Sequence, residues 1–295
     1  MRSYHLILLV PLLLGAIQPC ICAPRFKSTF TLWQLPEQTH SQMMSYVMRT
    51  GKGKVIVIDG GTRGDAAYLK AFLKKLGGEV EAWFLTHPHF DHYEALADTL
   101  SNPDGIKVKR LYASMPQEEW VRQYEPEWAY GIAEINAAVK KSGKCFNEMQ
   151  LGEVLDFDGV RVEVLGVKNP EIHTNAVNNS SVVLRVQDSQ KSVLFLADLG
   201  LEGGEKLLKS KFAKRLHTDY VQMAHHGQSG VSERVYQLIQ PSYCLWTTPA
   251  WLWDNDAGAG KDTGPLKTFE VRGWMTKFQI KKQFVTSIDG LSEID

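Results

Sequence analysis

The stretch that decides the fold is Thr86-His87-Pro88-His89-Phe90-Asp91-His92. It places four side chains able to bind a metal ion directly after the apolar run Val80 to Leu85. A loop at the end of a buried strand can turn alternate side chains toward one point, so we expect His87 and His89 to hold one ion. Asp91 and His92 then point toward a neighbouring second ion. Imidazole and carboxylate groups are suitable zinc ligands, so the stretch predicts two divalent ions, with zinc as the expected metal.

Short apolar runs separated by glycine flank the metal-binding stretch on both sides. Before it we expect a helix at Asp65 to Leu76 and strands at Phe30 to Leu35, Met44 to Arg49, Lys54 to Ile58 and Val80 to Leu85. After it we expect a hairpin at Leu155 to Val167, a helix from about Gly203 to Arg215, and strands at Ser181 to Val186, Ser192 to Leu196 and Tyr220 to Met223. Strand, helix and strand recur in each half, which predicts an α/β fold of two packed sheets flanked by helices.

One long stretch of helical character, Pro116 to Lys141, lies between the two halves and is rich in Glu, Trp and Tyr. It is either a packing helix with a solvated face or a lid over the metal site, and the sequence leaves both interpretations open. No internal repeat at solenoid spacing and no linker divides the chain. We therefore expect residues 24–295 to form a single domain.

Residues 1–23 have the pattern of a signal peptide. Arg2 supplies a positive start, Leu6 to Ile17 is almost unbroken in apolar character, and a short segment ending at Ala23 follows. The apolar run is short for a bilayer-spanning helix, which needs about 20 residues. We expect cleavage near Ala23, secretion to an extracytoplasmic location and no membrane attachment afterwards, with an uncleaved anchor or lipidation at Cys20 as alternatives.

The charges of the chain balance, because Lys plus Arg and Asp plus Glu each number 33. No long-range field therefore steers the protein toward polyanions, and the sequence gives no strong signal of nucleic-acid binding. The expected partner is a small molecule or the end of a polymer. The oligomeric state and a disulfide between Cys145 and Cys244 both stay open.

The pattern His-X-His-X-Asp-His after a strand resembles the signature of the metallo-β-lactamase superfamily, which implies a four-layer αββα sandwich. Three further features resemble the superfamily, one before this pattern and two after it. Asp59-Gly60-Gly61 is similar to a motif whose aspartate braces the metal loop without binding metal. Asp198 is similar to the aspartate that bridges both metals, and His225 to the last histidine of the second site.

Two positions depart from the superfamily pattern or are ambiguous. Many members have Gly-His-Thr before the strand that we expect at Ser181, and that histidine completes the first metal site. Here the corresponding stretch holds Asn178 and Asn179, and His173 is the nearest histidine. Either His173 reaches in from a longer loop, or the first metal has only His87, His89 and Asp198 and binds more weakly; whether an asparagine completes the site stays open. In the pair His225-His226, we expect His225 to be the metal ligand. His226 would then line the substrate pocket or donate a proton to the leaving group.

The resemblance implies hydrolysis by a metal-bound hydroxide that Asp91 holds and orients. Asn178 to Leu184 and His225-His226-Gly227 are similar to the hydrolase domain of bacterial DNA-uptake channels and to a secreted choline-phosphate esterase of teichoic acid. That likeness indicates a phosphoester or phosphodiester substrate. The rival functions are an iron-dependent oxidoreductase and a metal-free ligand-binding member of the same fold. Diiron members usually carry a carboxylate at the position of His89, so this histidine favours hydrolysis over that class. Mononuclear iron dioxygenases of sulfur compounds keep the histidines and stay open as an alternative.

Overall fold

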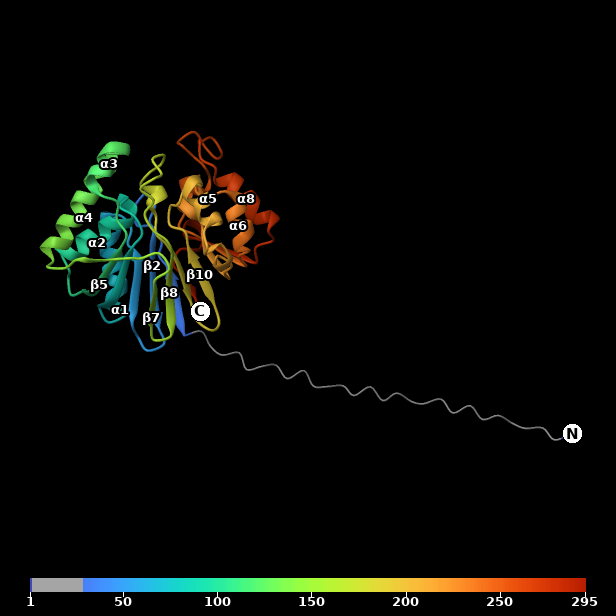
Figure 1. Cartoon of the computed structure of the whole chain (residues 1–295), viewed down its shortest axis with the longest axis horizontal. Coiled ribbons are helices and arrows are strands. Elements are labelled where there is room, and N and C mark those ends of the chain that lie inside the picture. Colours follow the sequence, from blue (N-terminus) through green and yellow to red (C-terminus); the bar gives the residue numbers. More distant parts are fainter. Residues whose placement is uncertain (2–28) are drawn as a thin grey trace.

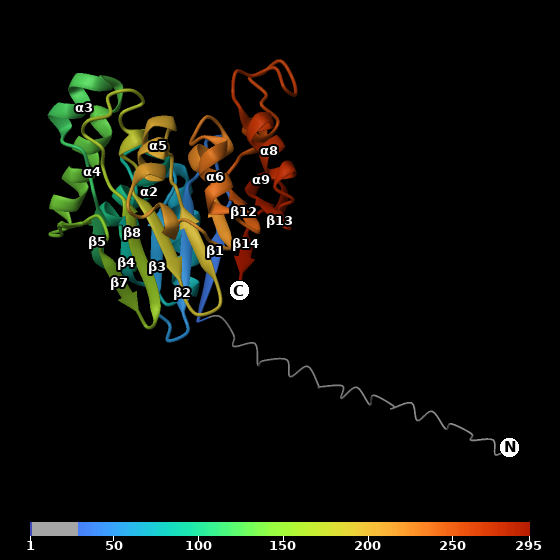
Figure 2. The same ribbon diagram turned by 45° about the vertical axis from the view of Figure 1, so that its right-hand side comes forward.

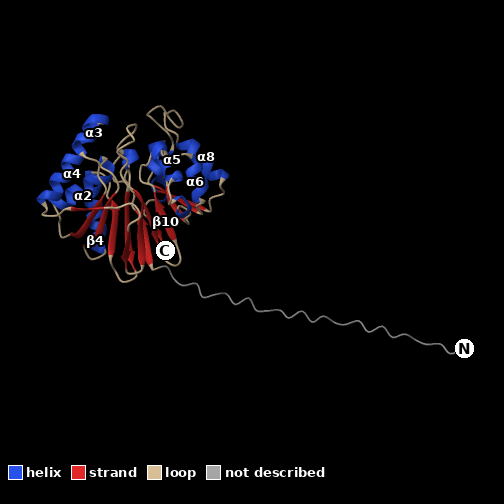
Figure 3. Ribbon diagram, in the orientation of Figure 1, coloured by secondary structure: helices blue, strands red, loops and turns tan. Residues whose placement is uncertain are grey.

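The computed structural model describes Met1 and residues 29–295, so most of the expected signal peptide lies outside the described residues. Two sheets of seven strands each pack face to face, and helices cover the outer face of each (Figures 1 and 3). The strand order is β14-β1-β2-β3-β4-β5-β6 in the first sheet and β13-β12-β11-β10-β9-β8-β7 in the second. The four-layer αββα sandwich expected from the sequence is confirmed.

The strands are short, as the spacing of glycines predicted. The first sheet contains β1 (Phe30–Gln34), β2 (Ser45–Thr50), β3 (Val55–Asp59), β4 (Glu79–Leu85), β5 (Lys107–Ala113), β6 (Phe146–Glu148) and β14 (Ser292–Ile294). The second contains β7 (Val154–Phe157), β8 (Val160–Gly166), β9 (Val183–Gln187), β10 (Ser192–Phe195), β11 (Tyr220–Gln222), β12 (Tyr243–Trp246) and β13 (Lys282–Val285).

The helices fall into two groups, one for each sheet (Figure 2). Those of the first half are α1 (Ala66–Lys75), α2 (Phe90–Ser101), α3 (Glu118–Tyr124) and α4 (Ala129–Lys141). Those of the second half are α5 (Leu201–Lys209), α6 (Glu233–Ile239), α7 (Ala250–Trp253), α8 (Thr268–Lys277) and α9 (Thr286–Asp289). The helix expected from Gly203 to Arg215 is thus α5 followed by a separate 3-10 turn at Ala213–Arg215.

Alternation of side chains along β3 shows how the layers are held together. Ile56 and Ile58 point into the core between the two sheets, whereas Val55 and Val57 pack against the helices of the first half. Successive side chains of a strand point to opposite faces, so a strand covered on both faces is apolar throughout. All five residues of β3 are buried.

Parallel strands in both sheets bring their carboxyl ends to the same end of the molecule. β3 pairs with β4 in parallel, and β10, β11 and β12 form a parallel set in the second sheet. In α/β sheets, ligands bind outside the carboxyl ends of such strands. The residues that follow β3, β4, β10 and β11 therefore meet at one edge of the sandwich.

The segment from Pro116 to Lys141 is not one helix. It divides into α3, a 3-10 turn at Pro126–Trp128 and α4, because proline disfavours a helical conformation in the residue before it. On α4, Ile135 and Val139 join the core of the first half. Of the two interpretations that the sequence left open, the structure favours a packing element.

In the described residues, no helix combines the length and apolar character that crossing a membrane requires. Cys145 is exposed and Cys244 is buried, and both are free thiols. The disulfide that the sequence left open is therefore not formed.

Gly131 allows α4 to approach the metal-binding loop. An added Cβ at this position would lie 2.6 Å from the carbonyl oxygen of Pro88 and 3.0 Å from the ring of Tyr93. We expect Gly131→Ala to lower the free energy of unfolding by about 1–3 kcal/mol, because a close-packed interior resists added volume. Urea unfolding followed by circular dichroism measures this change.

Gly273 in α8 provides the matched control, because within the described residues a Cβ there would meet no heavy atom within 4 Å. Gly273→Ala should raise the free energy of unfolding by up to about 1 kcal/mol through helix propensity. Equal effects of the two substitutions would contradict the close approach of α4 to the loop.

Candidate metal centre

The metal-binding stretch occupies the turn between β4 and α2. His87 follows β4 in the loop, and His89 is the extended N-cap residue directly before α2. Asp91 lies in the first turn of α2, where the helix dipole favours a negative charge. His92 follows it in the same turn. A change from strand to helix within six residues thus turns all four side chains toward one place.

Asp59, at the end of β3, braces this loop as expected. Its Oδ1 accepts a hydrogen bond of 2.8 Å from the backbone N–H of Thr86, and its Oδ2 accepts one of 2.7 Å from the Thr86 hydroxyl. The same Oδ2 lies 2.8 Å from Nδ1 of His92. A carboxylate at Nδ1 fixes the ring so that Nε2 is the free nitrogen.

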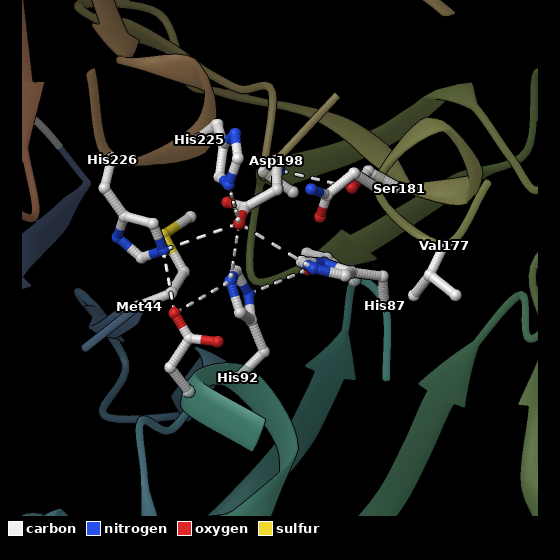
Figure 4. Close-up of polar contacts among 12 residues, drawn as sticks. Met44, His87, His92, Val177, Ser181, Asp198, His225 and His226 are labelled. Carbon is white, nitrogen blue, oxygen red and sulfur yellow. Dashed lines mark hydrogen bonds and ion pairs between the residues drawn. The ribbon is translucent and has the colours of Figure 1, made fainter. Parts of the chain in front are cut away.

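Residues of the second half complete the centre (Figure 4). Asp198 follows β10, and its backbone N–H donates to the Ser181 hydroxyl at 3.2 Å. His226 lies in a 3-10 turn after β11, and its Nδ1 is 2.9 Å from the carbonyl oxygen of Thr247. Its Nε2 is therefore directed toward the two aspartates, 3.0 Å from Oδ2 of Asp91 and 3.5 Å from Oδ2 of Asp198.

Two groups of potential ligands share Asp198. The first consists of His87, His89 and Asp198, and the second of Asp91, His92, Asp198 and His226. Within each group, the ligand atoms lie within 4.8 Å of one another. Oδ2 of Asp198 is 3.8 Å from Nε2 of His87 and 3.4 Å from Nε2 of His92. This is the placement that a bridging carboxylate needs.

His225 and His226 exchange the places that the sequence analysis gave them. His226 is fully buried within the second group, whereas His225 lies outside both groups with its side chain 22% exposed and Nε2 3.8 Å from Asp198. Both histidines have left-handed backbone angles, with φ of 51° and 55°. This tight turn, continued by Gly227 at φ 83°, rotates the second histidine inward, whereas the sequence analysis expected the first histidine to be the ligand.

His173 also differs from its expected place, because it belongs to neither ligand group. Its ring stacks on Tyr124 at a centroid distance of 3.8 Å and an angle of 7°. The loop that carries it instead contacts α3, where Trp120 donates a hydrogen bond to the carbonyl of Pro170. Within the described residues, the first group therefore has three candidate ligands, the imidazoles of His87 and His89 and the carboxylate of Asp198.

Burial and neighbouring charges shift the ionisation of the histidines in opposite directions. Burial lowers the pKa of His89 to about 4 and the pKa of His87 well below its usual value. Burial also acts to lower the pKa of His226, but Asp198 and Asp91 outweigh it and raise that pKa to about 10. The first group thus offers neutral imidazoles, whereas the second has carboxylates that already attract positive charge.

Aspartate ionisation follows the same contacts. Burial acts to raise the pKa of Asp198, but His226 and His92 outweigh it and hold that pKa well below the usual range. At Asp59 burial prevails over His92 and Thr86, and the pKa is raised. Asp198 is consequently held in its anionic form, the form in which a carboxylate can bind a metal ion.

The unpartnered atoms of the site fit divalent metal ions. Five buried atoms of the site make no regular hydrogen bond within the described residues: Nε2 of His87, His89, His92 and His226, and Oδ1 of Asp198. Of these, Nε2 of His226 and of His92 face carboxylate oxygens of Asp91 and Asp198 at 3.0 and 3.4 Å. Buried polar atoms without partners are costly, so such a cluster indicates a ligand that satisfies them together. Imidazole nitrogens with carboxylate oxygens form a ligand set suited to zinc.

Comparison with known proteins identifies the family. The family model described as "Metallo-beta-lactamase superfamily" matches residues 40–228, a range that contains both ligand groups. The chain belongs to the metallo-beta-lactamase superfamily. No curated protein matches it. The narrower likeness to DNA-uptake hydrolase domains and the choline-phosphate esterase stays a prediction.

Solved structures support the fold of this superfamily member. The metallo-beta-lactamase fold protein YhfI from Bacillus subtilis is similar with a TM-score of 0.55 and 10% identity, over 90% of this chain and 99% of that chain. CmlA, a diiron β-hydroxylase from Streptomyces venezuelae, has a TM-score of 0.53 and 12% identity, over 91% of this chain and 54% of that chain. This chain thus spans about half the length of CmlA, and the likeness concerns the fold alone.

Three supporting residues were missed by the sequence analysis. Thr86 and Thr247 position metal-site residues through hydrogen bonds, and Trp128 lies with its ring centroid 4.3 Å from that of His89. Thr86 directly precedes His87, so its position in the sequence could have suggested a role. Nothing in the local sequence distinguishes Thr247 or Trp128 from ordinary core residues.

The exchange of His225 and His226 leads to a test with a matched pair of variants. We expect His226→Ala to lose most of its bound metal, because it removes a buried ligand nitrogen of the second group. His225→Ala should retain the metal content of the wild type. Plasma mass spectrometry on protein dialysed without added metal measures both, and the reverse pattern would restore His225 as the ligand.

Proposed function

We propose that this superfamily member is a metal-dependent hydrolase that uses two divalent ions, with zinc preferred, to cleave phosphoesters or phosphodiesters. The observation that carries the proposal is the convergence of five unpartnered buried ligand atoms on two groups that share Asp198. Divalent ions bound there would activate water near neutral pH and stabilise negative charge that develops on the substrate.

The residues of the chain would perform the remaining steps. Asp91 is almost fully buried, its backbone carbonyl accepts a hydrogen bond from Met44, and its Oδ2 faces His226. This fixed carboxylate would orient the attacking water and accept its proton. Among the histidines around Asp198, His225 has the most exposed side chain, so a substrate that enters the site would meet it first.

Two arguments favour hydrolysis over the rival functions. His89 offers an imidazole where diiron oxidoreductases of this fold usually have a carboxylate, and the likeness to CmlA rests on fold alone. A member that had lost its metals would have no need of unpartnered ligand nitrogens in its interior. The choice of phosphoesters rests on the sequence likeness of Asn178 to Leu184 and His225 to Gly227.

We also propose that the protein acts outside the cytoplasm on a small molecule or the end of a polymer. This part rests on the signal-peptide pattern of residues 1–23 and on the balanced charge of the chain. It is independent of the metal centre.

The test compares metal-free protein with protein reloaded with zinc, manganese or iron. Reloading with zinc should restore hydrolysis of bis(p-nitrophenyl) phosphate, and Asp91→Ala should lower kcat by about 10²–10⁴-fold, the usual contribution of a general base. Asp98→Ala is the matched control, because Asp98 lies on the same helix and pairs with Lys70 away from the metal ligands. Its kcat should stay within about twofold of the wild type, since it removes no group with an acid–base role.

Two outcomes would contradict the proposal. One is iron as the retained metal together with substrate-dependent oxygen consumption, which indicates an oxidoreductase. The other is full metal loading with no hydrolysis of phosphomonoesters, phosphodiesters, lactams, lactones or thioesters.

A further inference from the structure

The two ligand groups are unequal in number and charge. The first offers two imidazoles and one carboxylate, and the second offers two imidazoles and two carboxylates. Because Asp198 is common to both, the difference between the groups is Asp91. A second carboxylate strengthens the attraction for a divalent cation in a site from which water is largely excluded.

The ligands of the two groups also differ in what holds them. Both histidines of the second group have Nδ1 beside a strong acceptor, the carboxylate of Asp59 for His92 and the carbonyl of Thr247 for His226. In the first group, Nδ1 of His87 lies 3.2 Å from a hydroxyl, that of Thr86, and the ring of His89 packs on Trp128. Charged or carbonyl acceptors at Nδ1 raise the basicity of Nε2 more than a hydroxyl or an aromatic face does.

An apolar cluster borders the first group where Trp128 contacts His89. Val177 is fully buried in a small cluster with Val121, Ala129 and Ile132, against which Trp128 packs. Trp128 in turn contacts His89. Figure 4 shows Val177 on the His87 side of the centre, across from His226. A valine has no ligand atom, so this cluster offers the first group nothing.

Hydrogen bonds fix the position of that cluster. The backbone N–H of Val177 donates to Oε2 of Glu125 at 2.7 Å, which ties it to the end of α3. Further along, Val182 donates to the carbonyl of Thr86 at 3.0 Å, and Ser181 accepts from Asp198. These hydrogen bonds fix both ends of the segment from residue 177 to 182. The ring of His173 stacks on Tyr124 and is not directed into the first group.

We infer that the two metal positions differ in affinity, the second group holding its ion tightly and the first holding an exchangeable ion whose occupancy Val177 limits. This inference rests on the proposed function, since both need metal at these groups. It makes the number of ions bound, and with it the hydrolytic rate, depend on the supply of free metal. The first position is a metal-responsive site within the same centre.

Metal titration of the intact protein tests the inference. Metal-free protein is titrated with Co²⁺ and with Zn²⁺ against a chromophoric chelator, and the Co²⁺ absorption bands distinguish the two sites. The first equivalent should bind on the order of 10- to 100-fold more tightly than the second, the range that supporting partners produce in metal sites. His226→Ala should lose the tightly bound ion, whereas His89→Ala should lose only the weakly bound ion.

The variant Val177→His tests the inference in the opposite direction, because it adds a possible metal ligand to the first group. With an imidazole in place of the valine, the weakly bound metal ion should bind with an affinity closer to that of the tightly bound one. Dialysed protein should then retain close to two ions per chain. Val121→His is the control, because it places an imidazole in the same apolar cluster on α3. It should leave both equivalents unchanged.

The outcomes separate this inference from the proposed function. Two equivalents of equal affinity, or a tight equivalent lost in His89→Ala and kept in His226→Ala, would overturn the inference while leaving hydrolysis intact. Absence of any bound metal would overturn the proposed function as well. If Val177→His does not fold, the titrations of the wild type and the two ligand variants still decide between these outcomes.

Discussion

The carboxylate of Asp59 joins the end of β3 to both ends of the metal-binding loop, which lies much later in the sequence. It accepts hydrogen bonds from the backbone and the hydroxyl of Thr86 after β4, and it holds His92 in the first turn of α2. It is fully buried, so these partners are what make its charge tolerable in the interior. The positions of all four ligands in the loop depend on this one side chain, although it contributes no ligand atom of its own.

The architecture makes that contact possible. β3 and β4 are parallel neighbours, so their carboxyl ends lie side by side, and Asp59, whose backbone turns to a φ of 55°, reaches Thr86. The second sheet repeats the arrangement, with β10 delivering Asp198 and β11 delivering His226 at the same end of the sandwich. The metal centre is consequently built between two rigid sheets, and each sheet supplies one side of it.

Much of this was predictable from the sequence, because the governing patterns are local. The loop from Thr86 to His92, the aspartate after β3 and the aspartate after β10 each follow an apolar run, and the end of a strand determines where such residues lie. The exchange of His225 and His226 was not predictable. It depends on two consecutive left-handed residues, a conformation that non-glycine residues rarely adopt.

His173 shows a second limit of sequence analysis. Its spacing from Ser181 permitted a ligand role, but stacking on Tyr124 holds it in a different part of the molecule. Tyr124 lies about fifty residues earlier in the chain, and no pattern in the sequence connects the two side chains. Contacts of this kind arise from how α3 packs, and the packing of a helix interrupted by proline is not determined by its periodicity alone.

The pairing of β1 with β14 has a consequence for how the chain folds. Trp33 and Glu293, joined by a hydrogen bond between these strands, are 260 positions apart, and Lys191 donates to backbone carbonyls of both strands. Until β14 is synthesised, β1 is an open edge of its sheet, which is a template for pairing with another chain. Contacts at such separation form slowly. Loss of β14 would therefore leave a metal centre that is complete in its ligands on a protein prone to aggregate.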